Sequence, residues 1–168
     1  YLLKQLTALP LQDQTFLELG AGNGLISISA AKHGAQVTAS DISELVVKTL
    51  KQNALDNNVS IQIIKSDLFN QIPKQTFDII AINPPYYPKQ ARNDLEMAWY
   101  CGVNFEYFQA LFSQIKDYMD TSSLVLMVLS DGCDIPKITS IAKTNGLSFT
   151  LFHQQKIWWE KEFIFRIQ

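Results

Sequence analysis

The stretch Thr15–Gly24, which reads Thr-Phe-Leu-Glu-Leu-Gly-Ala-Gly-Asn-Gly, decides the fold. Its first half, Thr15–Leu19, has the length and apolar content of a buried strand, and a helical pattern over Gly24–His33 follows at once. Glycines at every second position of the junction let a ligand approach the backbone closely. A dinucleotide-binding fingerprint would need a third glycine at position 25, where this chain has leucine. We therefore expect a ligand loop that does not bind a pyrophosphate.

Outward from this stretch, strand-like and helical segments alternate, as in a parallel sheet with crossover helices. We expect strands at Thr15–Leu19, Gln36–Ser40, Ile61–Lys65, Phe77–Ile82 and Leu124–Leu129, and helices at Tyr1–Leu9, Gly24–His33, Ser43–Asn57, Asn104–Met119 and Ile135–Asn145. Two strand-like runs, Leu147–Gln155 and Glu160–Ile167, are joined so tightly that they must form an antiparallel hairpin. The sequence predicts an α/β fold with five parallel strands, a terminal hairpin that adds one antiparallel strand, and helices on both faces.

Length and composition set the broad class. The 168 residues have room for one domain, expected over residues 1–168 with an N-terminal helix and linker over 1–12. No apolar run reaches the ~20 residues of a membrane span, and no signal peptide is expected. Cys101 and Cys133 are too few for a disulfide framework, and His33 and His153 are isolated. We expect a cytoplasmic protein with reduced thiols, no metal site and two structural histidines. The net charge of −2 argues against a protein that coats duplex nucleic acid.

Acidic residues end the next two strands. Asp41 follows the second strand, about twenty residues beyond the glycine loop, and a carboxylate there can accept both hydroxyls of a ribose. Asp67 ends the third strand, where it can accept from an adenine amine with Leu68 and Phe69 flanking the ring. Ligands in open α/β sheets bind at the carboxyl edge of the strands, so we expect these residues to share one site with the glycine loop.

The most specific motif is Asn83-Pro84-Pro85-Tyr86, directly after the fourth strand. The prolines stiffen the loop and remove two backbone donors, which leaves the Asn83 side-chain oxygen and a neighbouring carbonyl as acceptors. Two acceptors can orient a planar NH2 group toward a methyl donor while Tyr86 stacks on it. A sulfonium donor needs no strong general base, which fits a sequence without a His or Cys nucleophile constellation.

In their order and spacing, Glu18–Gly24, Asp41, Asp67 and Asn83–Tyr86 resemble the class I S-adenosylmethionine-dependent methyltransferases that act on amide or exocyclic nitrogen. Within this group the chain looks like the HemK/PrmC-related branch, which methylates the glutamine of a Gly-Gly-Gln loop in peptide-chain release factors. The resemblance implies a Rossmann-like fold with a seven-stranded sheet, S-adenosylmethionine as cofactor and a protein substrate such as a release factor. It implies that Gly20, Gly22, Asp41 and Asp67 contact the cofactor, and we add Glu18, Asn23, Gly24, Ile42, Leu68 and Asn83 to this set. It also implies that Asn83, Pro84 and Tyr86 form the clamp for the acceptor amide, and we add Pro85 to this clamp.

The chain departs from the family pattern in places. Ala98-Trp99-Tyr100-Cys101-Gly102 stands where shorter members have Ala-Trp-Ala-Gly-Gly. The helical N-terminal substrate domain of bacterial members is not visible, and the family's Pro-x-x-Asp-Ser/Thr stretch is expected to precede Tyr1. Some shorter relatives need an activating partner subunit, so the resemblance leaves room for one here.

Two aromatic features have alternative interpretations. The irregular stretch 87–102 is long enough to be a substrate-side loop, and we expect Trp99 to wall the acceptor pocket, with packing beneath the loop as the alternative. For Trp158-Trp159, packing in the core or at an edge is the favoured interpretation, and docking of a partner is the alternative.

Three other functions stay open. An N6-adenine methyltransferase acting on DNA or RNA would use the same clamp on a flipped base, with Lys89, Arg92 and Lys156 forming a phosphate-facing patch. A non-catalytic cofactor-binding scaffold is an alternative of another class. A nicotinamide-dependent dehydrogenase is disfavoured by the glycine spacing.

Overall fold

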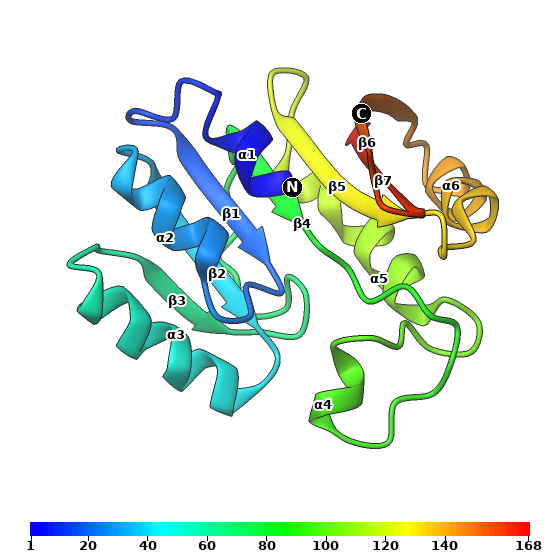
Figure 1. Cartoon of the computed structure of the whole chain (residues 1–168), viewed down its shortest axis with the longest axis horizontal. Coiled ribbons are helices and arrows are strands. Elements are labelled where there is room, and N and C mark those ends of the chain that lie inside the picture. The colour runs from blue at the N-terminus through cyan, green and yellow to red at the C-terminus, as the bar shows by residue number, and fades with distance from the viewer.

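A seven-stranded sheet with helices on both faces forms the molecule (Figure 1). The computed structural model describes residues 1–168, with only the side chain of Ile157 outside the description. The strands are β1 (Thr15–Leu19), β2 (Gln36–Asp41), β3 (Gln62–Lys65), β4 (Ile79–Ile82), β5 (Leu124–Ser130), β6 (Phe149–Ile157) and β7 (Glu160–Ile167). The helices are α1 (Leu2–Leu6), α2 (Leu25–Lys32), α3 (Glu44–Asp56), α4 (Asp94–Met97), α5 (Glu106–Gln114), the 3₁₀ turn η1 (Ile115–Tyr118) and α6 (Ile135–Thr144).

The strand order is β3-β2-β1-β4-β5-β7-β6. The five strands from β3 to β5 pair in parallel, and β7 pairs antiparallel with β5, from Val125 opposite Ile167 to Ser130 opposite Glu162. The last strand, β6, lies antiparallel to β7 at the edge. The predicted five parallel strands and single inserted antiparallel strand are confirmed.

The core lies on both faces of the sheet, as alternation along β1 shows. Phe16 packs with Leu2 and Leu6 of α1 and with Ala30 of α2. The next residue, Leu17, joins the opposite cluster with the aromatic residues of α5. Both faces of β1 are therefore buried, which is why its sequence is nearly continuous in apolar residues.

Several predicted bounds are wrong. β4 begins at Ile79 rather than Phe77, because the Asp78 carboxylate accepts hydrogen bonds from the Thr15 backbone N–H and hydroxyl at 2.8 and 2.7 Å. The helix predicted from Asn104 to Met119 is divided between α5 and η1. Stretch 87–102 contains the short helix α4, which the Asn93 side chain caps by accepting from the Glu96 N–H at 3.0 Å. The first helix ends at Leu6, four residues before Pro10.

Within the described part of the chain, the helices are all too short or too polar to cross a membrane.

Candidate functional site

The glycine loop between β1 and α2 is shaped by left-handed backbone. Gly20, Gly22 and Gly24 have φ of 69°, 54° and 83°, a region that disfavours other residues. A Cβ at Gly24 would overlap Cδ1 of Leu50, so the approach of α3 also requires glycine there. A Cβ on Gly20 or Gly22 would meet nothing within 4 Å. The space over the first half of the loop is therefore open to a ligand.

Glu18 lies beneath this loop and is only 5% exposed. Its Oε2 accepts from the Ser27 backbone N–H at 2.9 Å and from the Ser27 hydroxyl. Ser27 is in the first turn of α2, where backbone N–H groups lack helical partners. Burial raises the pKa of Glu18 to about 7, the Ser27 hydrogen bonds oppose this shift, and the charge of Asp41 adds to it. Glu18 thus ties α2 to β1, and its predicted contact with a cofactor stays a prediction.

Asp41 joins two loops at the carboxyl edge of the sheet. Its Oδ2 accepts from the Gly22 N–H at 3.1 Å and its Oδ1 from the Ser43 N–H at 3.0 Å. The Asp41 backbone carbonyl also accepts from the Ser66 N–H at 2.9 Å, which brings in the loop after β3. Each carboxylate oxygen has a further lone pair for a ligand hydroxyl. Ser43, the first residue of the predicted helix, occupies the N-cap of α3, and its side chain makes no capping bond.

The loop after β3 presents Asp67 and Leu68 and buries Phe69. Asp67 is exposed, and the Leu68 backbone is held at φ 47° by the Ser66 hydroxyl, which donates to the Leu68 carbonyl at 2.7 Å. Phe69 is 1% exposed and stacks on Tyr118 in the core, with ring centroids 4.3 Å apart. The prediction that Phe69 flanks an adenine ring is therefore wrong, because its ring completes the core. Ile42 and Asn23 are exposed at the same edge.

Tyr107 belongs to this edge and was missed from the sequence. It is half-buried at the start of α5. Burial raises the pKa of its hydroxyl, and the negative charges of Asp41 and Asp67 raise it further. The hydroxyl thus lies within the field of both carboxylates. Nothing in the sequence separates Tyr107 from its neighbours Phe105 and Phe108, which are buried core residues.

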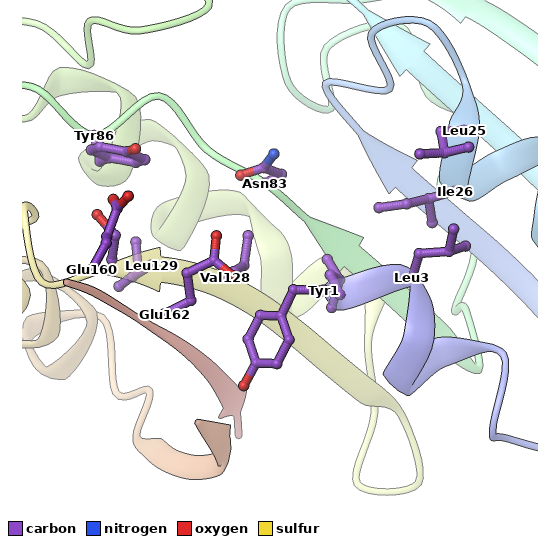
Figure 2. Close-up of a pocket in the computed structure, with 12 residues that line it drawn as sticks. Tyr1, Leu3, Leu25, Ile26, Asn83, Tyr86, Val128, Leu129, Glu160 and Glu162 are labelled. Atoms are coloured by element: carbon purple, nitrogen blue, oxygen red, sulfur yellow. The ribbon is translucent and has the colours of Figure 1, made fainter. Parts of the chain in front are cut away.

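Asn83 follows β4 directly and lines a pocket of about 310 Å³ (Figure 2). Pro84 beside it is buried, which fixes the loop, while Asn83 itself is exposed. Tyr86 also lines the pocket; burial raises its pKa, and a hydrogen bond with Ser130 opposes the shift. The other walls come from the start of α1, the start of α2, the end of β5 and the start of β7. Because Leu19 of β1 pairs with Ile82 of β4, the motif follows a strand that neighbours the one before the glycine loop, and it also lines the pocket.

Backbone hydrogen bonds join the two ends of the stretch 87–102. The Tyr87 N–H donates to the Trp99 carbonyl and the Cys101 N–H to the Tyr87 carbonyl, at 3.0 and 2.9 Å. The Trp99 side chain is 56% exposed, so it does not pack beneath the loop. The pocket beside Asn83 is lined by other residues. The predicted role of Trp99 as a substrate wall stays a prediction.

Trp158 and Trp159 form the turn between β6 and β7, where they are 79% and 82% exposed. The interpretation that they pack in the core or at an edge is wrong, because a turn with Trp158 at φ 60° projects both indoles outward. Their rings meet edge to face at 5.4 Å. The next residue, Glu160, lines the pocket that contains Asn83.

Cys101 and Cys133 are buried and unpaired, and His33 and His153 bond the Ser29 carbonyl and the Tyr1 hydroxyl. Across the described residues there is no group of three or more His, Cys, Asp or Glu side chains that could hold a metal ion.

Comparisons with known proteins agree with this geometry. Residues 1–100 match the family model described as the methyltransferase small domain. The chain is 46% identical over 78 residues to a putative protein N5-glutamine methyltransferase of Methanocaldococcus jannaschii, covering 46% of this chain and 39% of that protein. It is 36% identical over 123 residues to the release factor glutamine methyltransferase of Streptococcus pneumoniae, covering 72% of this chain and 41% of that protein. The chain thus spans about two fifths of the length of these relatives.

Among solved structures, the 16S rRNA N2 G1207 methyltransferase of T. thermophilus, in complex with AdoMet and guanosine, superposes with a TM-score of 0.71. The sequences are 21% identical, and the match covers 98% of this chain and 41% of that chain. At this identity the likeness is one of fold, and it confirms the Rossmann-like methyltransferase fold expected from the sequence.

Proposed function

This chain belongs to the methyltransferase small domain family, and on that premise we propose that it transfers a methyl group from S-adenosylmethionine to the side-chain amide of a glutamine in a protein. The observation that carries the proposal is the position of Asn83, exposed after β4 between the glycine-loop edge and the pocket.

The carboxyl edge of β1, β2 and β3 fits S-adenosylmethionine. Open space over Gly20 and Gly22 lets the backbone contact a ligand, and Asp41 has free lone pairs for ribose hydroxyls. Asp67, Leu68 and Ile42 surround the position for the base, and Tyr107 is a further wall. Asn23, Gly24 and Glu18 support the loop, and Asn83 closes the site toward the acceptor. When bound, the cofactor supplies an electrophilic methyl group on a sulfonium.

On the acceptor side, the chain positions a weak nucleophile. The nitrogen of an amide is unreactive because its lone pair is delocalised. The Asn83 side-chain oxygen and a backbone carbonyl of the Pro84-Pro85 segment accept the two N–H bonds of the amide, which points its nitrogen along one direction. Tyr86 lies against the planar group. Loss of the proton follows transfer and needs no strong base, so orientation is the main contribution of these residues.

A protein glutamine is favoured over a nucleic-acid base. Both relatives described above are named as glutamine methyltransferases. The pocket is lined by Glu160 and Glu162, which would repel phosphate. Of the three cations that a nucleic-acid patch would need, Arg92 is paired with Glu96 at 3.8 Å and Lys89 lies over the Tyr100 ring. A cytoplasmic location is part of the proposal, and the unpaired cysteines support it.

The test is methyl transfer from labelled S-adenosylmethionine to a release factor and to the same factor with its Gly-Gly-Gln glutamine changed to alanine. We expect label in the first and none in the second. Asn83→Ala should lower the transfer rate by about 100-fold or more, because an aligned hydrogen bond is lost, while calorimetry shows cofactor binding within a few-fold. Asn57→Ala, an exposed asparagine at the end of α3, is the control and should leave both unchanged.

Label in adenine of a DNA or RNA oligonucleotide, with none in the release factor, would replace the proposal by nucleic-acid methylation. If the protein binds the cofactor but methylates no acceptor, the next test is for an activating partner subunit. That subunit is a prediction from the family resemblance.

A further inference from the structure

We propose that Ser130, the last residue of β5, is a positioning residue for Tyr86 and fixes the direction of its ring on the acceptor side of the site. This inference rests on the proposed function and adds to it a residue that lies outside the Asn83–Tyr86 motif.

The loop that contains Tyr86 has few backbone donors of its own. Pro84 and Pro85 have no N–H groups, so the two residues before Tyr86 donate no backbone hydrogen bond. The next stretch is different, because the Tyr87 N–H donates to the Trp99 carbonyl at 3.0 Å. The Tyr86 ring can also rotate about its side-chain bonds, which the backbone leaves free. Its direction must therefore come from the groups that the side chain contacts.

Ser130 lies beside Tyr86 on the wall of one pocket. Both residues line this pocket, and Figure 2 shows Tyr86 at the end where Leu129 lies, away from Leu3 and Leu25. Ser130 is buried, whereas Tyr86 is half-buried. The two side chains form a hydrogen bond. A buried hydroxyl at the end of a strand thus meets the hydroxyl of the tyrosine that faces the acceptor.

The direction of this hydrogen bond follows from the groups around Ser130. The Ser130 Oγ accepts from the Gly132 N–H at 3.2 Å, which leaves its own proton to be donated. The Cys133 Sγ is the other neighbour, at 3.9 Å, and thiol sulfur is a weak acceptor. The bond with Ser130 lowers the pKa of Tyr86 against the effect of burial, as a donor to the phenol oxygen does. Ser130 therefore donates and Tyr86 accepts.

The Ser130 hydroxyl is fixed by the turn that follows β5. The Ser130 N–H donates to the Cys133 Sγ at 3.2 Å, and the Cys133 N–H donates to the Ser130 carbonyl at 3.0 Å. A Cβ on Gly132 would lie 3.4 Å from the Ser130 Oγ and 4.0 Å from the Tyr87 Oη. The turn thus lies against Tyr86 through its serine and against Tyr87 through its glycine. The two tyrosine rings also contact each other, with centroids 4.8 Å apart.

This contact should influence the rate of transfer more than the binding of the acceptor. Asn83 and a backbone carbonyl still hold the amide when the Tyr86 ring turns, so affinity changes little. A ring that is free to tilt no longer confines the planar group, and its nitrogen is then aligned with the methyl donor for less of the time. The loss of one hydrogen bond between neutral groups corresponds to about tenfold in rate.

The experiment compares two buried serines at opposite ends of β5. Ser123→Ala is the matched control, because Ser123 is buried and its hydroxyl donates to the Phe77 carbonyl at 2.7 Å. We expect Ser130→Ala to lower kcat for methyl transfer about tenfold, with KM for the acceptor and Kd for the cofactor within about twofold. Ser123→Ala should leave kcat within about twofold. Ser130→Thr keeps the hydroxyl and should restore most of the rate. Circular dichroism confirms that each variant is folded.

A double-mutant cycle tests the contact between the two residues. Tyr86→Phe removes the phenol oxygen that accepts from Ser130, so Ser130→Ala should lower kcat no further in the Tyr86→Phe background. Additive losses in the double variant would overturn the inference. So would an equal loss of kcat in Ser123→Ala and Ser130→Ala, because the effect would then come from stability alone.

A measurement without methyl transfer separates this inference from the proposed function. In protein labelled with carbon-13 at tyrosine Cζ, the resonance of Tyr86 is the one absent from Tyr86→Phe. We expect Ser130→Ala to shift this resonance and Ser123→Ala to leave it in place, because Cζ carries the phenol oxygen that accepts the bond. A shift in a protein that transfers no methyl group to glutamine would contradict the proposed function and leave the Ser130–Tyr86 contact standing. Normal transfer by Ser130→Ala, without a shift, would overturn the contact and leave the proposed function standing.

Discussion

The cofactor edge and the acceptor side of this protein are built by different means. At the cofactor edge, one residue joins the loops: the Asp41 carboxylate accepts from backbone N–H groups of the loops after β1 and β2, and its backbone carbonyl accepts from the loop after β3. Around the acceptor pocket, side chains from the start of α1, α2, the loop after β4, β5 and β7 meet, and most of them are half-buried or buried. The cofactor edge therefore depends on the backbone conformation of its loops, and the acceptor pocket depends on which side chains line it. Substitutions should therefore damage the two regions in different ways.

Of the substitutions in these two regions, a change of Gly24 at the cofactor edge should have the largest effect on stability. Gly24→Ala places a Cβ against Leu50 in a left-handed conformation, and we expect the free energy of unfolding to fall by about 3 kcal/mol. Gly20→Ala has the same backbone handedness but open space, so strain alone should cost about 1 kcal/mol. Urea denaturation measures both. Cofactor affinity should fall in the Gly20 variant in spite of its stability, because the methyl group enters the space for the ligand. Equal losses of stability would show that overlap with α3 does not matter.

A smaller effect concerns the pH dependence of stability, which we expect from Glu18 beneath the glycine loop. The pKa of Glu18 is raised to about 7, so the folded state favours the protonated form, and stability should decline as pH rises from 5 to 8. Glu18→Gln keeps an acceptor for Ser27 and removes the ionisation. The decline between pH 5 and pH 8 should therefore be smaller in this variant by roughly 2 kcal/mol.

Ser27→Ala tests the ionisation of Glu18 in the opposite direction, because it should raise the pKa of Glu18 further. It removes a hydrogen bond that favours the carboxylate, so the decline should extend to higher pH. Chemical denaturation at several pH values measures these slopes. Identical slopes in the wild-type and Glu18→Gln proteins would mean that Glu18 is ionised throughout this range.

The smallest effect on stability is expected on the acceptor side. Changing Trp158 and Trp159 to serine should alter the free energy of unfolding by less than about 0.5 kcal/mol, because both indoles are exposed. Phe108→Ala, at a fully buried aromatic residue, is the contrast and should cost about 3 to 4 kcal/mol. A large loss of stability would show that the indoles pack against the protein.

The same division explains what could be predicted from the sequence. The parallel strands and the glycine loop after the first of them follow from local rules about apolar runs, glycine and helix starts, and the predicted parallel sheet with its terminal hairpin is confirmed. Phe69 and the two tryptophans were misjudged, because local sequence does not say which side of a loop meets the core. Nothing in the local sequence distinguishes Glu160 and Glu162. They share a pocket with Asn83 only because β7 inserts beside β5, which places residues nearly eighty positions apart around one pocket.

The insertion of β7 has a further consequence for the design of the molecule. Because β6 runs in the same direction as β5, the β6–β7 turn emerges at the edge of the sheet where the parallel strands end. This turn contributes nothing to the core, yet it adjoins the pocket. A change in Trp158–Glu160 would therefore alter the border of the pocket and leave the buried core and the glycine loop as they are.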